Sequence, residues 1–477
     1  MTILVGVDQG TTGTRAVAFD LGLRQVAESY HPAQVSHPRP GWIEKDAAHT
    51  VETVRAALAD LRGELGADIA AVGLDNEGET VVAWDAGSLE PLAPAVVWGS
   101  RASQPVVDRL VEQGRGARIE ELSGLPLDPY FSATKMRWLV EQDGAVGDAA
   151  RAGTLRMGTF DAYITARLGG AARTEPSTAG RTQLQAIAAP GAWDPELLEL
   201  HGVDAGWLPE IGPSVGALGQ IEGLPLRALL VDQTASLAGH GCFAAGEAKA
   251  TYGTGIFLLQ QAGPSAPQDG NGLIPIVAWR LGESPSYALD GGVFSAGTVV
   301  TWLREGLGAL EDAAGSEALA LSVPDTGGVR FLPALAGMGA PWWLPDARAV
   351  IAGITAGTTR AHIVRAALDA LCFRVRDIVD RLPSRPAVLR VDGGLTANGY
   401  LVQRQADVLG LPVEVAAVAE TTALGAAAMA GIGAGLLTVE QIRAAVAGGR
   451  RVEPRDAAAA DDDYRKWRRF AERAAHL

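Results

Sequence analysis

The sequence predicts an α/β protein whose sheets are flanked by helices, and three observations support this prediction. Of the 477 residues, 48% are hydrophobic, which supplies a core for two or three domains. Apolar runs typical of strands alternate with segments of helical spacing. Four of these runs end in an aspartate, at Asp8, Asp75, Asp232 and Asp392. Because ligands of such sheets bind beyond the carboxyl ends of the strands, we expect the functional site near these aspartates.

The order of the elements follows from the periodicity of the apolar residues and from the turns between them. The predicted elements are strands at residues 2–9, 15–22 and 69–75, helices at residues 46–65, 360–382 and 420–435, and a solvated terminal helix at residues 461–477. Glycine-containing turns at residues 241–246 predict the seam between two halves of the chain.

Composition excludes several classes of function. A net charge of −15 and a sequence pI near 5.0 argue against nucleic-acid binding, which needs clustered Lys and Arg. The sequence has no apolar run long enough for a membrane span and no secretory signal at its N-terminus, so we expect a cytoplasmic protein with a small-molecule partner. We expect Cys242 and Cys372 to be buried and to pack as small apolar residues. The seven histidines show no metal-binding spacing.

Three glycine-rich turns follow predicted strands, although neither common phosphate-binding fingerprint occurs. They are Asp-x-Gly-Thr-Thr from Asp8, Tyr-Gly-Thr-Gly from Tyr252 and Asp-Gly-Gly from Asp392. Glycines let the backbone approach an anion, threonine hydroxyls bond its oxygens, and an aspartate can hold hydrated Mg²⁺. One such turn is more often only a turn, but three in one chain predict a phosphate site.

Longer segments resemble the FGGY family of actin-like carbohydrate kinases, with the glycerol kinases as the most similar branch. They include "DQGTTGTRAVAFD", "PGWIEKD", "GTFDAYI", "TYGTGIFLL", "GAPWWLPDARAVIAGIT" and "LRVDGGLTANGYLVQRQADVLGLPVEV", and the resemblance covers residues 3–440. It implies two domains of ribonuclease-H-like topology, residues 1–245 and 246–477, with a nucleotide cleft between them. The first domain would bind the polyol and carry the catalytic base, and the second would bind ATP. Homodimers and homotetramers are frequent in the family.

The resemblance also implies catalytic roles, residue by residue. Asp232 matches the general base that accepts the proton of the attacking hydroxyl, and Gln233 would orient the polyol. An alternative role for Asp232 is to cap a helix that begins near Thr234. Asp8 would be the Mg²⁺-side carboxylate. The phosphate-facing residues of the first hairpin would be Thr11, Thr12 and Arg15.

The nucleotide contacts follow from the same resemblance. Thr254, Gly255 and Gly297 match the turns that cradle phosphate, and Gly394 and Asn398 match residues that border and bond the adenine. Thr301 stands where many glycerol kinases have glutamine, so that contact is not expected here.

The polyol site matches the family only in part. Glu79, Trp98, Tyr130, Asp232 and Phe257 match glycerol contacts, but the family segment Asn-Gln-Arg-Glu-Thr reads Asn-Glu-Gly-Glu-Thr here, which puts Gly78 in place of the arginine. Two interpretations stay open: an enlarged pocket for a longer polyol, or compensation by Arg101.

The predicted function is ATP- and Mg²⁺-dependent phosphorylation of a primary hydroxyl, with glycerol as the leading substrate. A kinase of a four- or five-carbon polyol or sugar is the alternative. A nucleotide-binding protein without catalysis is a third reading, which the presence of Asp232 disfavours.

Overall fold

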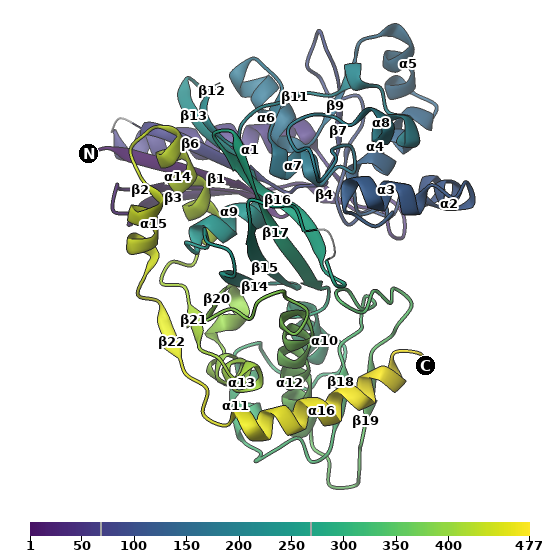
Figure 1. The fold of residues 1–477 in the computed structure, drawn as a ribbon, viewed down its shortest axis with the longest axis vertical. Helices are drawn as coiled ribbons and strands as arrows, with labels where there is room; N and C mark the ends of the chain where they lie inside the picture. The colour runs from purple at the N-terminus through teal and green to yellow at the C-terminus, as the bar shows by residue number, and fades with distance from the viewer. Residues whose placement is uncertain (67–68, 268–269) are drawn as a thin grey trace.

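A computed structural model describes residues 1–66, 69–267 and 270–477. The chain forms two α/β halves, each built around one large mixed sheet (Figure 1). The assignment of residues 1–245 and 246–477 to separate domains stays a prediction.

The first sheet has the strand order β12-β13-β6-β1-β2-β3. Its strands are β1 (Ile3–Gln9), β2 (Gly13–Phe19), β3 (Gln25–Pro32), β6 (Ile69–Asn76), β12 (Val215–Ile221) and β13 (Leu224–Val231). The pairs β1–β2 and β2–β3 are antiparallel, whereas β1–β6 and β6–β13 are parallel. The carboxyl ends of β1, β6 and β13 therefore lie at the same edge of the sheet.

Helices cover both faces of this sheet. On one face, α1 (Ala47–Leu65) and α6 (Phe160–Gly169) share a core with Ile3, Val5 and Val7. Helix α1 begins where the side chain of Asp46 accepts from the backbone N–H of His49, and it ends at Gly66, which has a left-handed backbone. The predicted strands and the predicted helix at residues 46–65 are thus confirmed.

Smaller elements surround the end of the first sheet. Two of them precede β6 in the chain, β4 (Val35–Ser36) and β5 (Glu44–Lys45). The others lie between β6 and β13, and they are β7 (Val82–Asp85), β8 (Ala95–Val96), α2 (Gln104–Glu112), α3 (Gly116–Ser123), α4 (Ser132–Glu141), α5 (Ala145–Ala152), β9 (Leu155–Gly158), β10 (Arg173–Thr174), α7 (Pro176–Gly180), α8 (Pro195–His201), η1 (Ala205–Trp207) and β11 (Glu210–Ile211).

The second sheet repeats the plan of the first, in the order β16-β17-β15-β14-β20-β21-β22. Its strands are β14 (Ala248–Tyr252), β15 (Ile256–Gly263), β16 (Ile274–Leu281), β17 (Ser284–Val293), β20 (Leu389–Asp392), β21 (Val413–Val415) and β22 (Arg450–Val452). Antiparallel β14, β15 and β17 correspond to β1, β2 and β3, and parallel β20 and β21 correspond to β6 and β13. This repetition explains why the aspartate-ended strands recur along the sequence.

The remaining elements follow in the second half of the chain, and the C-terminal helix lies at the bottom of the view (Figure 1). They are α10 (Gly297–Glu305), α11 (Gly315–Leu321), β18 (Arg330–Leu332), β19 (Val350–Ala352), α12 (Arg360–Val379), η2 (Gly394–Ala397), α13 (Gly399–Leu409), α15 (Val439–Val446) and α16 (Ala457–Ala474). The predicted helices at residues 360–382 and 461–477 are confirmed, and α16 buries Tyr464 and Trp467 in addition to presenting charges.

Two helices join the halves on the second face of the first sheet. Helix α9 (Asp232–Gly239) packs against α14 (Thr421–Gly433), and both share a core with Leu4 of β1. Helix α14 comes from the second half of the chain yet lies directly on β1 and β6. A Cβ at Gly6 or Gly73 would lie 1.8 or 2.0 Å from a carbonyl oxygen of α14, so only glycine permits this approach.

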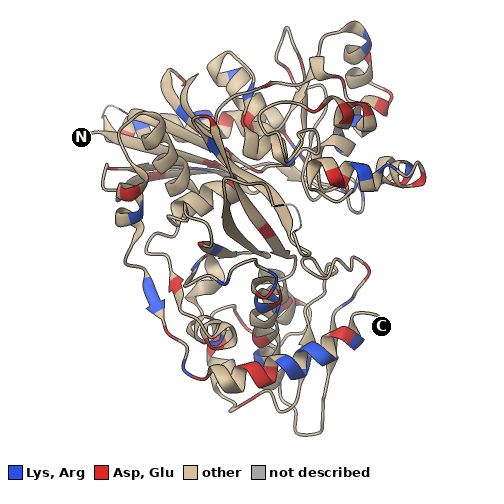
Figure 2. Ribbon diagram, viewed as in Figure 1, with Lys and Arg blue, Asp and Glu red and all other residues tan. Residues whose placement is uncertain are grey.

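No helix among the described residues is long and apolar enough to cross a membrane. Acidic and basic residues are interspersed along the elements, most visibly on α16 (Figure 2). Cys242 and Cys372 are buried free thiols, as predicted.

Candidate active site

Three aspartates lie at the carboxyl ends of adjacent parallel strands in the first sheet. Asp8 of β1 and Asp75 of β6 are register partners, and Asp232 directly follows β13. Asp75 is fully buried, and neither of its carboxylate oxygens accepts a hydrogen bond from a donor in the described ranges. The aspartates that end three separate apolar runs therefore form one cluster.

Burial perturbs all three carboxyl groups. It raises the pKa of Asp8 to about 6. The pKa of Asp75 lies well above its ordinary value because of burial and then because of the charges on Asp8 and Asp232. Burial, followed by the negative charges of Glu79 and Asp8, raises the pKa of Asp232 to about 7. A carboxyl group with a pKa near neutrality is suited to accept and return a proton.

The donor set of this cluster fits hydrated Mg²⁺. Mg²⁺ prefers carboxylate oxygens, keeps several waters and shares itself with substrate phosphates rather than occupying an all-protein cage. The unpaired oxygens of Asp75 supply acceptors without donors. Among the residues with described positions, no group of three or more His, Cys, Asp or Glu is arranged to hold a metal ion by itself.

Asp232 is the first residue of α9, so the helix begins two residues before the expected start near Thr234, and its N-cap is Val231. The Oδ1 atom of Asp232 accepts from the backbone N–H of Gln233 over 2.6 Å. The side-chain oxygen of Gln233 accepts from Nζ of Lys249 on β14 over 2.8 Å. No described residue accepts from the side-chain N–H groups of Gln233, which are therefore available to a ligand beside Asp232.

The first hairpin connects the predicted phosphate residues to the polyol residues. The hydroxyl of Thr11 donates to Glu77 and accepts from Nε1 of Trp98, each over 2.9 Å. Thr12 is exposed at the turn. Arg15 is the register partner of Asp8 on β2, and its Nε lies 3.2 Å from a carboxylate oxygen of Glu420, the N-cap residue of α14. The hairpin is thereby tied to both halves of the chain.

The predicted polyol residues gather around an arginine that sequence reasoning did not single out. The rings of Trp98 and Tyr130 meet edge to face, with centroids 5.5 Å apart. Nε of Arg181 donates to Glu79, and Nη2 of Arg181 donates to the Tyr130 hydroxyl over 3.4 Å. Burial raises the pKa of Glu79, although the charge of Arg181 opposes that shift.

The space beside Gly78 is filled. A Cβ at Gly78 would lie 2.4 Å from Cγ2 of Val231 and 3.4 Å from Cγ of Arg181. Side chains from two other segments therefore lie against this position, and the enlarged pocket stays a prediction. The side chain of Arg101 is exposed and donates to Gln104 over 2.6 Å, and its compensating role also stays a prediction.

The second half of the chain contributes to the polyol residues through β15 and β17. Phe257 of β15 is the register partner of Gly292 of β17. Two residues before Gly292, the carboxylate of Asp290 accepts from Nη1 of Arg181 over 3.0 Å. The other oxygen of Asp290 is buried and has no hydrogen-bond partner among the described residues.

The predicted phosphate turns of the second half pack against each other through their backbones. Thr254 and Gly255 connect β14 to β15, and Gly297 begins α10. The backbone N–H of Gly297 donates to Gly253 over 3.0 Å, and that of Ala296 donates to Thr254 over 2.9 Å. A Cβ at Gly255 or Gly297 would lie 2.6 or 2.7 Å from a carbonyl oxygen, so these positions require glycine.

The predicted adenine residues differ in their freedom to bind a ligand. No atom lies within 4 Å of a Cβ built at Gly394, so this position opens to space. Asn398 caps α13 by accepting from Leu401 over 2.9 Å and donates to Ser316 over 3.0 Å. Thr301 is exposed on α10. The adenine contacts of Gly394 and Asn398 stay predictions.

Sequence reasoning missed several residues of the site. Arg181 is 102 positions from Glu79 in the chain, and neither Arg181 nor Asp290 stands at the end of one of the four apolar runs that predicted the site. Lys249 is a buried lysine within an apolar strand, which was the one available signal. His240, to which no role was assigned, is buried 3.4 Å from Asp392 and lowers the pKa of that aspartate.

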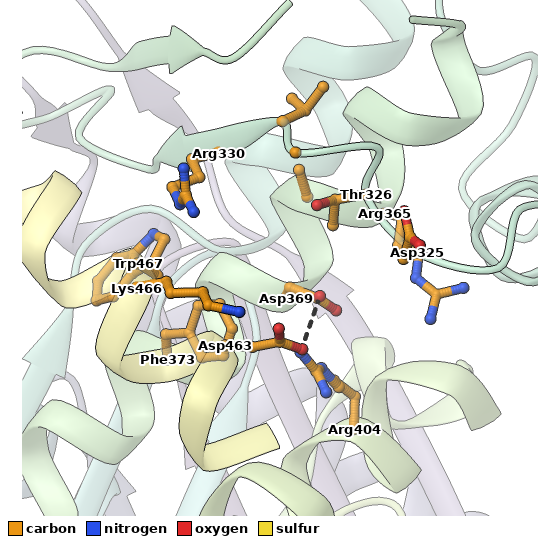
Figure 3. Close-up of a pocket in the computed structure, with 13 residues that line it drawn as sticks. Asp325, Thr326, Arg330, Arg365, Asp369, Phe373, Arg404, Asp463, Lys466 and Trp467 are labelled. Atoms are coloured by element: carbon orange, nitrogen blue, oxygen red, sulfur yellow. Dashed lines mark hydrogen bonds and ion pairs between the residues drawn. The ribbon is translucent and has the colours of Figure 1, made fainter. Parts of the chain in front are cut away.

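A second charged pocket lies in the second half of the chain, between α12, α13 and α16 (Figure 3). Arg404 donates to Asp369 over 3.2 Å and to Asp463 over 2.7 Å, and Arg365 donates to the carbonyl oxygen of Ala320 over 3.0 Å. Arg404, Asp369 and Asp463 therefore form an ion-pair network in the wall of this pocket.

Comparison with known proteins agrees with the geometry. The model of the FGGY family of carbohydrate kinases, N-terminal domain, matches residues 3–229, and the model of the C-terminal domain matches residues 248–434. Glycerol kinase of Symbiobacterium thermophilum is 41% identical over 447 residues, 91% of this chain and 90% of the relative. Glycerol kinase of Citrifermentans bemidjiense is 42% identical over 470 residues, 95% of this chain and 94% of the relative.

Solved structures support the same assignment. Plasmodium falciparum glycerol kinase with ADP has a TM-score of 0.93 at 28% identity, with 99% of this chain and 98% of that chain covered. Xylulose kinase from Lactobacillus acidophilus shares the fold, with a TM-score of 0.90 at 20% identity and coverage of 99% and 98%. The two sheets, the aspartate cluster and these matches together place this chain in the FGGY family of carbohydrate kinases.

Proposed function

We propose that this kinase transfers the γ-phosphoryl group of ATP to a primary hydroxyl of glycerol, which yields glycerol 3-phosphate and ADP. The observation that carries the proposal is Asp232, a half-buried carboxyl group with a pKa of about 7 whose charge interacts with that of Glu79 in the polyol cluster. The glycerol kinases that are 41% and 42% identical over more than nine-tenths of this chain support glycerol as the substrate.

The chemistry follows from the positions of the residues. Asp232 accepts the proton of the attacking hydroxyl, a new bond forms between that oxygen and the γ-phosphorus, and the bond to the bridging oxygen of ADP breaks. The transition state is loose and anionic, so positioning and charge stabilisation contribute most to the rate. Arg15 and the hydroxyls of Thr11 and Thr12 are the proposed groups that face this charge.

Asp8 is the proposed carboxylate on the Mg²⁺ side, and Asp75 lies next to it. When bound, Mg²⁺ would neutralise charge on the β- and γ-phosphates. The role of the protein is to place Asp8 at the end of β1, where the first glycine-threonine turn begins, and to keep bulk water from the buried carboxyl group of Asp75.

The remaining contacts divide between the two ligands. We assign the polyol to Glu79, Trp98, Tyr130, Gln233 and Phe257. In support, Arg181 donates to Glu79 and Tyr130, and Lys249 donates to Gln233. We assign the ATP phosphates to the turns at Thr254, Gly255 and Gly297, and the adenine to the neighbourhood of Gly394 and Asn398. We also propose that the protein acts in the cytoplasm, where ATP is available. Its proposed oligomeric state is a homodimer or a homotetramer.

A panel of polyols tests this function. Purified protein with ATP and Mg²⁺ is given glycerol, erythritol, both threitols and the pentitols, and ADP release and the phosphorylated product are measured. We expect the highest kcat/KM with glycerol. A higher kcat/KM with a four- or five-carbon polyol would overturn glycerol as the substrate, and ADP release that no polyol stimulates would overturn the kinase function.

A further inference from the structure

Arg181 is buried among the residues proposed to bind the polyol, and its guanidinium lies between the two halves of the chain. Its side chain is 7% exposed. It donates to Glu79 and Tyr130 in the first half and to Asp290 of β17 in the second half. Its guanidinium carbon also lies 5.6 Å from the centre of the Tyr130 ring.

The backbone of Arg181 is held by a helix far along the chain from Gly78. Arg181 is the C-cap residue of α7, and its backbone N–H donates to carbonyl oxygens of that short helix. The N-cap residue of α7 is Glu175, whose buried carboxylate accepts from the backbone N–H groups of Ser177 and Thr178. A rigid support thus places the stem of Arg181 beside Gly78, where its Cγ would lie 3.4 Å from a Cβ.

Arg181 retains hydrogen-bonding capacity after its protein contacts are counted. A guanidinium has five N–H groups. Three of them donate to Glu79, Asp290 and Tyr130, and no described residue accepts from the remaining two. Arg181 therefore has two N–H groups left for hydroxyl oxygens of a polyol.

Asp290 supplies the complementary acceptor. One carboxylate oxygen of Asp290 accepts from Arg181, whereas Oδ1 is buried without a partner within the described part of the chain. Leaving a buried carboxylate oxygen unpaired is costly, so such an atom indicates a missing donor. A polyol hydroxyl can both accept from Arg181 and donate to Oδ1 of Asp290.

We propose that Arg181 and Asp290 form a hydroxyl-reading pair in which Arg181 replaces the arginine absent at Gly78 and Asp290 accepts a hydrogen bond from the same or a neighbouring polyol hydroxyl. The inference rests on the proposed polyol kinase function and specifies its substrate contacts. Because the two residues belong to different halves of the chain, a bound polyol is held by both.

The test compares Arg181→Lys and Asp290→Asn with the wild type, using glycerol, 1,2-propanediol and 1,3-propanediol. Lysine keeps the charge but loses the planar fork, and asparagine keeps the shape but loses a carboxylate acceptor. We expect KM for glycerol to rise about 100-fold in either variant, whereas KM for ATP stays within about 3-fold of the wild type. Arg101→Lys is the matched control, and its kinetics should equal those of the wild type because its side chain is exposed and contacts Gln104.

The diols separate hydroxyl reading from a purely structural role. One of the two diols lacks the hydroxyl that the pair contacts, so the effect of each variant should shrink to about 3-fold or less with that diol. Equal losses with glycerol and both diols, or a glycerol KM in Arg181→Lys within about 3-fold of the wild type, would overturn the pair. Thermal melting and ATP binding identify any variant that fails to fold, and glycerol binding by calorimetry to Asp290→Asn then gives the decisive comparison.

The same design distinguishes the pair from the function on which it rests. If the wild type prefers a longer polyol, glycerol is wrong as the substrate, and the pair is tested with deoxy forms of the preferred polyol. If the wild type releases no ADP with any polyol, glycerol binding by calorimetry tests the pair. Absence of any polyol binding would overturn both.

Discussion

Nζ of Lys249 donates to the side-chain oxygen of Gln233 over 2.8 Å, and this bond connects β14 of the second half to the residue next to Asp232, the proposed catalytic base. The same ammonium donates to the Thr251 hydroxyl over 3.0 Å. Lys249 is buried, which lowers its pKa, and its positive charge lowers the pKa of Asp232. Lys249 thus acts on Gln233 through orientation and on Asp232 through charge.

Lys249→Met should therefore shift the pH dependence of the reaction. Removal of the ammonium raises the pKa of Asp232 further, so a smaller fraction of the base is ionised at pH 7. We expect the acidic limb of kcat/KM to move to higher pH and turnover at pH 7 to fall about 10-fold. Lys249→Arg keeps the charge and should leave the acidic limb near its wild-type position. A pH profile of Lys249→Met that coincides with the wild type would contradict this role.

Asp232→Asn should abolish most of the turnover while nucleotide binding persists. The loss of a positioned base lowers kcat by about 10²–10⁴-fold. Because the base accepts a proton only when ionised, kcat/KM of the wild type should fall as the pH is lowered through about 7, the pKa of Asp232. The residual activity of Asp232→Asn should lack this limb. Near-normal turnover in the variant, measured by ADP release, would show that Asp232 only begins α9.

The part of the site that could be predicted from the sequence is the part built from local patterns. Strand ends revealed Asp8, Asp75 and Asp232, because an apolar run followed by aspartate is visible in a few residues. Glycine turns such as that at Thr254 and Gly255 are visible for the same reason. The structure confirms the strands and helices that carry them.

The residues that could not be predicted act through contacts between distant segments. Arg181 reaches Glu79 across 102 positions and Asp290 across 109. The sequence shows that Gly78 lacks a side chain, but not that Val231 and Arg181 fill the space beside it. Packing of α14 from the second half onto β1 of the first half is invisible in the pattern for the same reason.

Asp75→Asn should stabilise the metal-free protein at alkaline pH. The pKa of Asp75 is raised in the folded state, so its contribution to stability is present below its ordinary pKa of 3.8 and is lost as the pH rises through the raised value. We expect Asp75→Asn to melt about 2–4 °C above the wild type at pH 8 in EDTA, with a smaller difference at pH 5. Added Mg²⁺ should reduce the difference in melting temperature between Asp75→Asn and the wild type at pH 8, because the ion offsets the charge of Asp75.

Asp161→Asn is the control for this measurement. Burial raises the pKa of Asp161 to about 7, but its carboxylate accepts from the hydroxyls of Thr159 and Thr174 and from the backbone N–H of Ala162. Added Mg²⁺ should change the melting temperature of Asp161→Asn by no more than it changes that of the wild type. A difference between Asp75→Asn and the wild type that is independent of both pH and Mg²⁺ would argue against a charged role for Asp75.

Any side chain at position 78 should impair polyol binding. A Cβ there would lie 2.4 Å from Cγ2 of Val231 and 3.4 Å from Cγ of Arg181, so the variant must displace a β-branched side chain, the stem of the arginine, or both. We expect Gly78→Ala to raise KM for glycerol about 10-fold and Gly78→Arg to reduce kcat/KM by 100-fold or more, on the order of the loss of a polar pocket contact.

Gly63→Ala is the matched control, because no atom lies within 4 Å of a Cβ built there. Combining Gly78→Ala with Val231→Ala removes the nearer obstruction and should recover most of the lost glycerol affinity. If Gly78→Arg instead improved kcat/KM for glycerol, the space beside Gly78 would have to be open in solution, and Arg181 could not be the arginine that occupies it.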